Sequence, residues 1–188
     1  MATTVSFVVV LLLFSSVSHA TNGKDVESNN DNVKTACAST PYPEMCFDYL
    51  SFMEGSKDAD LRTLIGMAVY KTTMRLTGAS SMASSITYDY PDMPEADYLC
   101  YETCSTELDN AKKTLYKSCT TKGGGTDWAH VNLDTVRRVL TDAKEKHNDW
   151  TCDKCTHGKY EKVDVISKGS EVQKLMAILA ALLDRAHK

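Results

Sequence analysis

Two pairs of cysteines constrain this chain more than any other feature of its sequence. Cys100 and Cys104 lie one helical turn apart, and Cys104 starts a stripe of small and apolar residues at steps of four, three and four. That spacing predicts a helix that buries the stripe and both thiols on one side. Cys152 and Cys155 follow about fifty residues later, after a glycine-rich turn. The stripe consists of Cys104, Leu108, Ala111 and Leu115.

A chain that folds back antiparallel between the pairs would bring Cys104 to Cys152 and Cys100 to Cys155. The two pairs of neighbouring thiols could then form two disulfides. A zinc site is another outcome, because two thiolates from each of two helices, with His157 nearby, can converge tetrahedrally. Cys152-x2-Cys155 also has the spacing of thioredoxin-like redox motifs, but these need a βαβ context that the sequence lacks. Free thiols titrated in the unfolded protein would separate these interpretations.

The first twenty residues carry the pattern of an export signal. An apolar run from Val8 to Phe14 is followed by Ser18-His-Ala20, which fits a small-x-small cleavage site. Seven apolar residues are too few to span a bilayer. We therefore predict a signal peptide over 1–20, secretion of the protein, a flexible polar leader over 21–32, and one folded domain over 33–188.

The net charge limits the classes of partner, and the cysteine count limits the number of disulfides. The formal net charge is −4, which argues against nucleic acid because phosphate binding uses clustered Lys and Arg. No later segment is long and apolar enough to predict a membrane anchor. Secretion favours disulfides among the seven cysteines, and the odd count leaves one thiol over. Cys119 is the expected leftover, either buried and inert or bridging two chains.

Helical patterns account for most of the predicted domain. Two short helices around Thr40-Pro-Tyr-Pro43 would form a hairpin, which Cys37 and Cys46 could crosslink. Four longer helices are expected over about 58–86, 94–119 and 127–147 and from the capping-box pattern Ser170-Glu-Val-Gln173 to about 186. The predicted fold class is all-α: an antiparallel four-helix bundle after a short disulfide-stapled hairpin.

The inner faces of these helices follow from their apolar spacing. The first long helix buries Leu61, Leu64, Ile65, Ala68, Thr72, Leu76, Ala79, Ala83 and Ile86. The third is expected to bury Trp128, Val131, Val136, Val139, Leu140 and Ala143, and the last Val172, Leu175, Leu179, Leu182 and Ala186.

Two outward faces are candidates for binding. The first long helix turns a stripe of hydroxyl groups away from its core side, which either contacts a partner or lies under another helix. The second long helix has polar residues opposite its buried stripe. The histidines are scattered surface residues without a paired acid at a recognisable spacing. The first stripe is Thr63, Tyr70, Thr73, Thr77 and Ser81; the second face is Glu102, Thr106, Lys113 and Lys117; the histidines are His130, His147, His157 and His187.

Three motifs resemble the plant invertase and pectin methylesterase inhibitors, a family of secreted helical proteins. The first is Cys37-x8-Cys46 around Thr40-Pro-Tyr-Pro43, similar to the family's N-terminal hairpin with its local disulfide. The second is Cys104-x6-Ala-x3-Leu, and the third is Thr151-Cys152, which is similar to the Thr-Cys that forms the inter-helix bridge. The likeness covers about residues 33–186.

The chain departs from the family pattern in four places. Cys100 and Cys155 are additional and predict a second rung beside Cys104 and Cys152. The segment 128–152 is about two helical turns longer than expected. Ala143-Lys-Glu-Lys replaces the usual Ser-Ala-Ala-Leu, and Ala177 stands where Asn is common.

The resemblance implies an inhibitor and leaves two target enzymes to choose between. Invertase inhibitors of the family carry a Pro-Lys-Phe motif that enters the invertase active site, and the matching positions here are Thr126-Asp127-Trp128. The reversed charge disfavours a carboxylate-lined glycosidase pocket. We therefore expect pectin methylesterase as the target, with acid invertase as the alternative. The expected contacts are Glu102, Thr106 and Lys113, or Tyr70 and Thr77.

The sequence contains no recognised catalytic motif. We expect a protein of the plant cell wall without catalytic, cofactor or metal residues, whose oligomeric state is open. A secreted helical storage or signalling protein without an inhibited enzyme is the alternative from another class.

Overall fold

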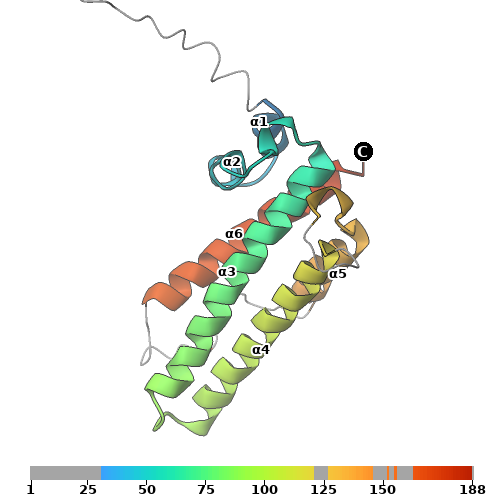
Figure 1. Ribbon diagram of the computed structural model, residues 1–188. Helices are drawn as coiled ribbons and strands as arrows, with labels where there is room; N and C mark the ends of the chain where they lie inside the picture. The colour runs from blue at the N-terminus through green and yellow to red at the C-terminus, as the bar shows by residue number, and fades with distance from the viewer. Residues whose placement is uncertain (1–30, 121–126, 146–151, 153–154, 156–162, 188) are drawn as a thin grey trace, which may run out of the picture.

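The computed structural model describes residues 31–120, 127–145, 152, 155 and 163–187. The chain forms a small helical hairpin followed by a four-helix bundle (Figure 1). This arrangement confirms the predicted all-α, disulfide-stapled fold. The signal peptide and the leader up to residue 30 lie outside the described residues and stay predictions. None of the described helices is long and apolar enough to cross a membrane.

The hairpin consists of α1 (Asp31–Cys37) and α2 (Pro43–Ser51). Pro43 stands in the first turn of α2, where its missing N–H costs nothing. A disulfide joins Cys37 to Cys46, and Thr40 Oγ1 donates to the carbonyl of Cys37 at 2.8 Å. The 3₁₀ turn η2 (Ser56–Asp58) leads from the hairpin into the bundle.

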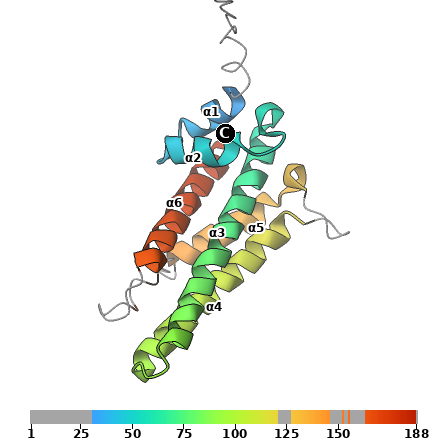
Figure 2. The same ribbon diagram turned by 60° about the vertical axis from the view of Figure 1, so that its left-hand side comes forward.

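The hairpin lies across the end of the bundle where α3 begins and α6 ends (Figure 2). The Arg185 side chain donates to the carbonyl of Thr35. Arg75 of α3 stacks over the Tyr49 ring at 5.4 Å, and Lys174 of α6 lies 5.9 Å from the Tyr42 ring. These contacts join both hairpin helices to the bundle.

The helix α3 (Leu61–Asp89) begins at an Asp60 cap, whose carboxylate accepts from the Thr63 N–H at 2.8 Å. Its predicted inner stripe is buried, apart from Leu61, which is half buried. The prediction of an outward stripe was wrong for one residue, because Thr73 is buried. Its hydroxyl donates to the Tyr70 carbonyl at 2.7 Å.

The helix α4 (Glu95–Ser118) follows Pro94, as predicted. Its stripe of Cys104, Leu108, Ala111 and Leu115 is buried, which confirms the face predicted from the helical spacing. Tyr101 is fully buried as well, and its burial was not predicted.

The next helix starts later than predicted. Trp128–His130 form a 3₁₀ turn, η3, which Asp127 caps by accepting from the Ala129 N–H at 3.1 Å. The helix α5 runs over Leu133–Glu145, and Asn132 accepts from the Thr135 N–H at 3.0 Å. The missed signal was Asn132, a favoured capping residue. Val131, Val136 and Val139 are buried as expected.

The last helix starts earlier than predicted. The helix α6 spans Val163–Arg185, so Ser170 lies inside it and the capping-box interpretation was wrong. Its predicted inner residues are buried except Ala186, which follows the helix and is exposed. Met176, Ile178 and Leu183 add to the buried face.

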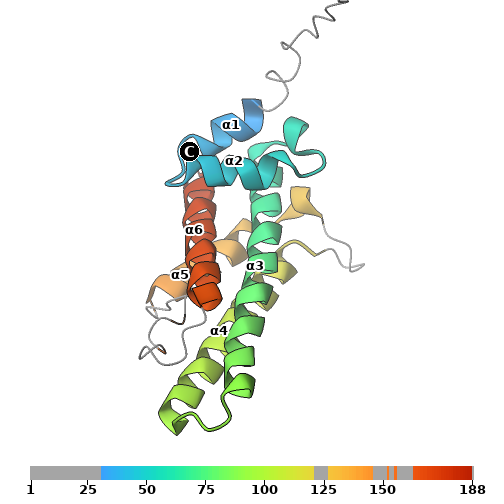
Figure 3. The same ribbon diagram turned by 90° about the vertical axis from the view of Figure 1, so that its left-hand side faces the viewer.

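The four long helices form a closed ring in which α3 contacts α4 and α6, while α5 contacts α4 and α6 on the other side (Figure 3). The pair α3 and α4 extends beyond the described parts of α5 and α6 (Figure 1). The side of this pair opposite its buried stripes is its outer side, and it faces away from α5 and α6.

Candidate partner-binding surface

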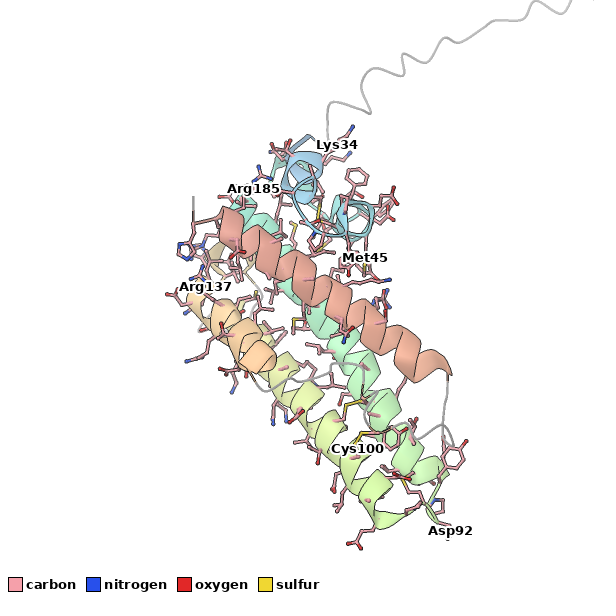
Figure 4. All side chains as sticks on the ribbon, turned by 180° about the vertical axis from the view of Figure 1, so that it is seen from behind. Lys34, Met45, Asp92, Cys100, Arg137 and Arg185 are labelled. Atoms are coloured by element: carbon pink, nitrogen blue, oxygen red, sulfur yellow. A yellow bond between two sulfur atoms is a disulfide. The ribbon has the colours of Figure 1, made fainter. Side chains whose placement is uncertain are left out.

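Three disulfides hold the scaffold of the candidate surface. Cys104 is bonded to Cys152 and Cys100 to Cys155, with Cα–Cα distances of 5.7 Å and 5.4 Å. The predicted pairing is confirmed. The zinc interpretation needed four free thiolates here, and the redox interpretation needed Cys152 to pair with Cys155, whereas each of these cysteines is bonded to a cysteine of the other pair. Figure 4 shows Cys100 towards the far end of α4 from the hairpin.

Cys119 is free and buried, as expected for the leftover thiol. Its sulfur lies 3.8 Å from the carbonyl oxygen of Gly66 and 3.7 Å from the hydroxyl of Ser118. Burial raises the pKa of the thiol. A protonated, enclosed thiol is a poor nucleophile, which fits the inert alternative rather than an intermolecular bridge.

A seam of three serines joins α3 to α4. The hydroxyls of Ser84 and Ser105 share a hydrogen bond of 2.6 Å. Ser80 Oγ donates to the Ser105 carbonyl at 3.2 Å, and Ser105 Oγ donates to the Ser80 carbonyl at the same distance. Short side chains allow two helices to approach closely, and the reciprocal bonds fix how α3 lies along α4. This seam could not be predicted from the sequence, because polar residues at an inter-helix contact give no hydrophobic periodicity.

The seam brings together the two faces that the sequence left as alternatives. Thr77 stands three residues before Ser80, and Glu102 stands three residues before Ser105. In antiparallel helices, equal steps from a shared contact point turn both side chains to the same side of the pair. We call this outer side the α3/α4 face. Its exposed members include Thr77, Ser81, Ser84, Glu102, Thr106 and Lys113.

The charges on the α3/α4 face are balanced. Lys113 lies 2.6 Å from an Asp109 carboxylate oxygen, and Lys112 binds the other oxygen. Hydrogen bonds from Lys112 and Lys113 lower the pKa of Asp109. Glu102 is exposed and forms no ion pair with the described residues, so it is available to a cation on a partner.

Two tyrosines flank the seam on α4. Tyr98 lies seven residues before Ser105 and Tyr116 eleven residues after it, which places both on the seam side of the helix. They are 40% and 44% exposed, so their rings are available for contact. Tyrosine supplies a large contact area with few rotatable bonds, and tyrosine with small hydroxyl residues is a recurrent composition of binding surfaces. The seven-residue step was the signal that could have identified Tyr98.

Tyr70 lies on the same side of α3, two turns before Thr77, but it is half covered. Its ring meets the ring of Trp128 edge to face, with centroids 4.8 Å apart and planes at 62°. Of the five predicted contact residues, Tyr70 is therefore the one partly covered by another aromatic ring, while Thr77, Glu102, Thr106 and Lys113 are exposed.

The turn at residues 127–130 is held in place by several contacts. The Asp127 N–H donates to the Cys119 carbonyl at 2.9 Å, and Asp127 Oδ2 lies 2.7 Å from His130 Nδ1. This pair corrects the expectation that His130 lacks an acid partner, although His130 is exposed as predicted. Trp128 is half buried against α3. His147 and His157 lie outside the described residues, and His187 is exposed.

The fold and the crosslinks define a class of protein: an all-α four-helix bundle with an N-terminal hairpin and disulfide bridges. The sequence matches the family described as plant invertase/pectin methylesterase inhibitor over residues 31–182. This match covers most of the chain, and the chain belongs to that family. A search of curated proteins finds no match.

Family membership sets the general activity. The chain is a proteinaceous inhibitor of pectin methylesterase or invertase, so its partner is an enzyme. Members of the family are inhibitors rather than enzymes, and they are usually extracellular.

Proposed function

We propose that this protein is secreted into the cell wall and inhibits a pectin methylesterase by laying the α3/α4 face over the enzyme's cleft. The observation that carries the choice of target is the fixed position of Asp127 and Trp128. These residues match the family segment that enters the invertase active site. Here the Trp128 ring packs on Tyr70, and the Asp127 carboxylate binds within its own turn.

This arrangement supports pectin methylesterase over invertase for two reasons. An aromatic side chain held against α3 must give up its contact with Tyr70 before it can enter another protein's pocket. A carboxylate at position 127 would also meet carboxylates of the same sign in a glycosidase site, where repulsion is strong at low dielectric.

The α3/α4 face supports the proposed mode of binding. The serine seam and the two disulfides between α4 and residues 152 and 155 fix the face before binding. A rigid surface loses little conformational entropy on association, so more of the contact energy becomes affinity. The face is polar with tyrosines at its seam, which is the composition of a non-obligate interface.

The test is an inhibition assay of the disulfide-bonded protein against purified pectin methylesterases and acid invertases. We expect inhibition of at least one pectin methylesterase and of no invertase. Thr77→Arg places a long cation in the centre of the face and should weaken inhibition roughly 30-fold or more, the effect of losing a hot spot. The matched control is Thr141→Arg, at an exposed threonine of α5 on the other side of the bundle.

Three outcomes would contradict parts of this proposal. Inhibition of invertase alone would reverse the choice of target. Equal effects of Thr77→Arg and Thr141→Arg would remove the α3/α4 face as the contact surface. Inhibition of neither class of enzyme would favour the storage or signalling alternative.

A further inference from the structure

A basic pocket opens at the hairpin end of the bundle, away from the α3/α4 face. Its volume is about 390 Å³, which lies within the range of roughly 300–1,000 Å³ that small-molecule sites occupy. Four of its eight lining residues are basic and one is acidic, in a chain whose net charge is −4. The pocket is lined by Arg62, His130, Asn132, Leu133, Asp134, Arg137, Ala186 and His187.

Four separate parts of the chain supply the basic side chains, and His130 belongs to the 3₁₀ turn η3. Arg62 comes from the first turn of α3, Arg137 from α5, and His187 from the residues after α6. Figure 4 shows Arg137 at this end of the molecule, on the same side as Arg185 at the end of α6. Basic side chains that the fold gathers into one concavity repel one another unless anionic groups lie between them.

Each of the two arginines makes one polar contact within the chain. Arg62 Nη2 donates to the Val131 carbonyl at 2.9 Å, which fixes its guanidinium at the mouth of the turn before α5. Arg137 Nη1 lies 3.3 Å from Asp134 Oδ1. Each guanidinium carries five N–H donors, so both keep donors for a ligand after these contacts. Arginine is suited to carboxylates because its planar fork binds both oxygens at once.

The rest of the lining suits a hydroxylated ligand. Asn132 uses its Oδ1 to cap α5, accepting from the Thr135 N–H, so its NH₂ group remains a donor. Leu133 supplies a half-buried apolar wall, on which the C–H face of a sugar ring could rest. Asp134 opposes a bound anion and is partly neutralised by Arg137, and Asp127 binds His130 from outside the pocket.

We propose that the basic pocket binds the carboxylate of an acidic sugar, with Arg62 and Arg137 as the anion-binding pair and Asn132 contacting a sugar hydroxyl. The choice of an acidic sugar rests on the proposed function, because a pectin methylesterase converts a sugar methyl ester into a free carboxylate. The pocket would then hold a stretch of the product polymer beside the inhibited enzyme. Arg62 lies fifteen residues before Thr77, about 22 Å along α3, so both sites can be occupied together.

The test measures binding to the inhibitor alone, by amide NMR shifts of the full disulfide-bonded protein at pH about 5.5, where imidazoles are ordinarily protonated. The probes are a short oligogalacturonate, the same oligomer fully methyl-esterified, and inorganic phosphate. We expect saturable shifts of the Asn132, Asp134 and His187 amides with the oligogalacturonate, and none with the uncharged ester. Arg137→Gln should weaken binding roughly tenfold, as expected for loss of a charge-assisted hydrogen bond.

The matched control is Arg138→Gln, which removes the same charge from the neighbouring exposed residue of α5 and should leave binding unchanged. Arg62→Gln should weaken binding as Arg137→Gln does, and Arg62→Lys, which keeps the charge at the anchored position, covers the case in which Arg62→Gln disturbs the turn. Equal binding of the acid and its ester, equal loss in Arg137→Gln and Arg138→Gln, or no saturable shift would overturn the proposal. Phosphate binding as tight as the oligogalacturonate would overturn the sugar assignment. Enzyme inhibition without oligogalacturonate binding would refute this inference alone.

Discussion

The backbone of Trp128 lies directly on Gly66 of α3. A Cβ atom placed on Gly66 would stand 2.3 Å from the Trp128 carbonyl oxygen and 2.8 Å from its Cα. Only a residue without a side chain allows the turn at 127–130 to approach α3 this closely. The carbonyl oxygen of Gly66 itself faces the sulfur of Cys119. Gly66 therefore joins the end of α4, the turn and α3 at one point.

Gly66→Ala should destabilise the protein although alanine is the better helix former. The clash is with main-chain atoms, which cannot rotate away, so the turn must move. We expect a loss of about 1–3 kcal/mol in the free energy of unfolding, measured by denaturant titration. Gly78→Ala is the control: Gly78 is half exposed in the same helix, and the change should be neutral or stabilise by up to about 1 kcal/mol. Equal behaviour of the two variants would mean that the contact with Trp128 is not tight.

The turn also shows why part of the fold could not be predicted from sequence. Periodicity marked Trp128 and Val131 correctly as residues that face the core, but it could not show that they lie in a 3₁₀ turn and its continuation rather than in α5. Core-facing spacing is the same for a helix and for a turn that another helix covers. Gly66 inside an otherwise helical pattern was the visible hint of a close backbone approach.

The two disulfide rungs between α4 and residues 152 and 155 should stabilise the protein non-additively. Each rung closes a long loop, with sequence separations of 48 and 55. Once one rung is present, the second closes only the short ring between them. In the chain-entropy model, replacing Cys100 and Cys155 by serine should cost about 2–3 kcal/mol, and removing the second rung from that variant about 4 kcal/mol more.

Guanidinium unfolding of the two double variants and the quadruple variant, followed by far-UV circular dichroism, measures this coupling. The control is Cys37→Ser with Cys46→Ser, whose loop is separate and whose cost should add independently to either rung. Strictly additive costs for the two rungs between α4 and residues 152 and 155 would contradict the shared-loop argument.

The cap of α3 should give a pH dependence of stability at the acid end. The Thr63 backbone N–H bonded to the Asp60 carboxylate lowers the pKa of Asp60 from its ordinary value. The folded protein thus binds the proton less readily than the unfolded chain, so this contribution is present above pH about 4 and is lost as pH falls through the lowered pKa. Asp60→Ala should cost about 1 kcal/mol at neutral pH.

Asp60→Asn is the matched control for this prediction. Asparagine caps helices about as well as aspartate but does not titrate. We expect near wild-type stability at neutral pH and a flatter decline between pH about 4 and pH about 2, from thermal unfolding at several pH values. A decline as steep as that of the wild type would show that Asp60 does not contribute to it.

The candidate surface was partly predictable for a physical reason. Glu102 and Thr77 could be identified as outward-facing, because a buried stripe defines its opposite face on each helix separately. That both lie on one side of a helix pair depends on which residues meet between α3 and α4, and this is set by the Ser84–Ser105 contact. Serines contribute no hydrophobic signal, so a sequence gives the faces of single helices but not their common orientation.

The thiol of Cys119 should be unreactive in the folded protein. It is 3% exposed, and burial raises the pKa of the thiol, so the thiolate that reacts is scarce even at mildly alkaline pH. With an aromatic disulfide reagent at pH about 8, we expect no fast reaction in native protein and one thiol per chain in guanidinium, because the other six cysteines are paired. Cys119→Ser is the control and should show none under either condition. Its polar hydroxyl in a buried place should also lower stability by about 1–2 kcal/mol, whereas Cys119→Ala loses only packing. Rapid labelling of the native protein, or three or more thiols after unfolding without reductant, would contradict the disulfide pairing and the burial of this residue.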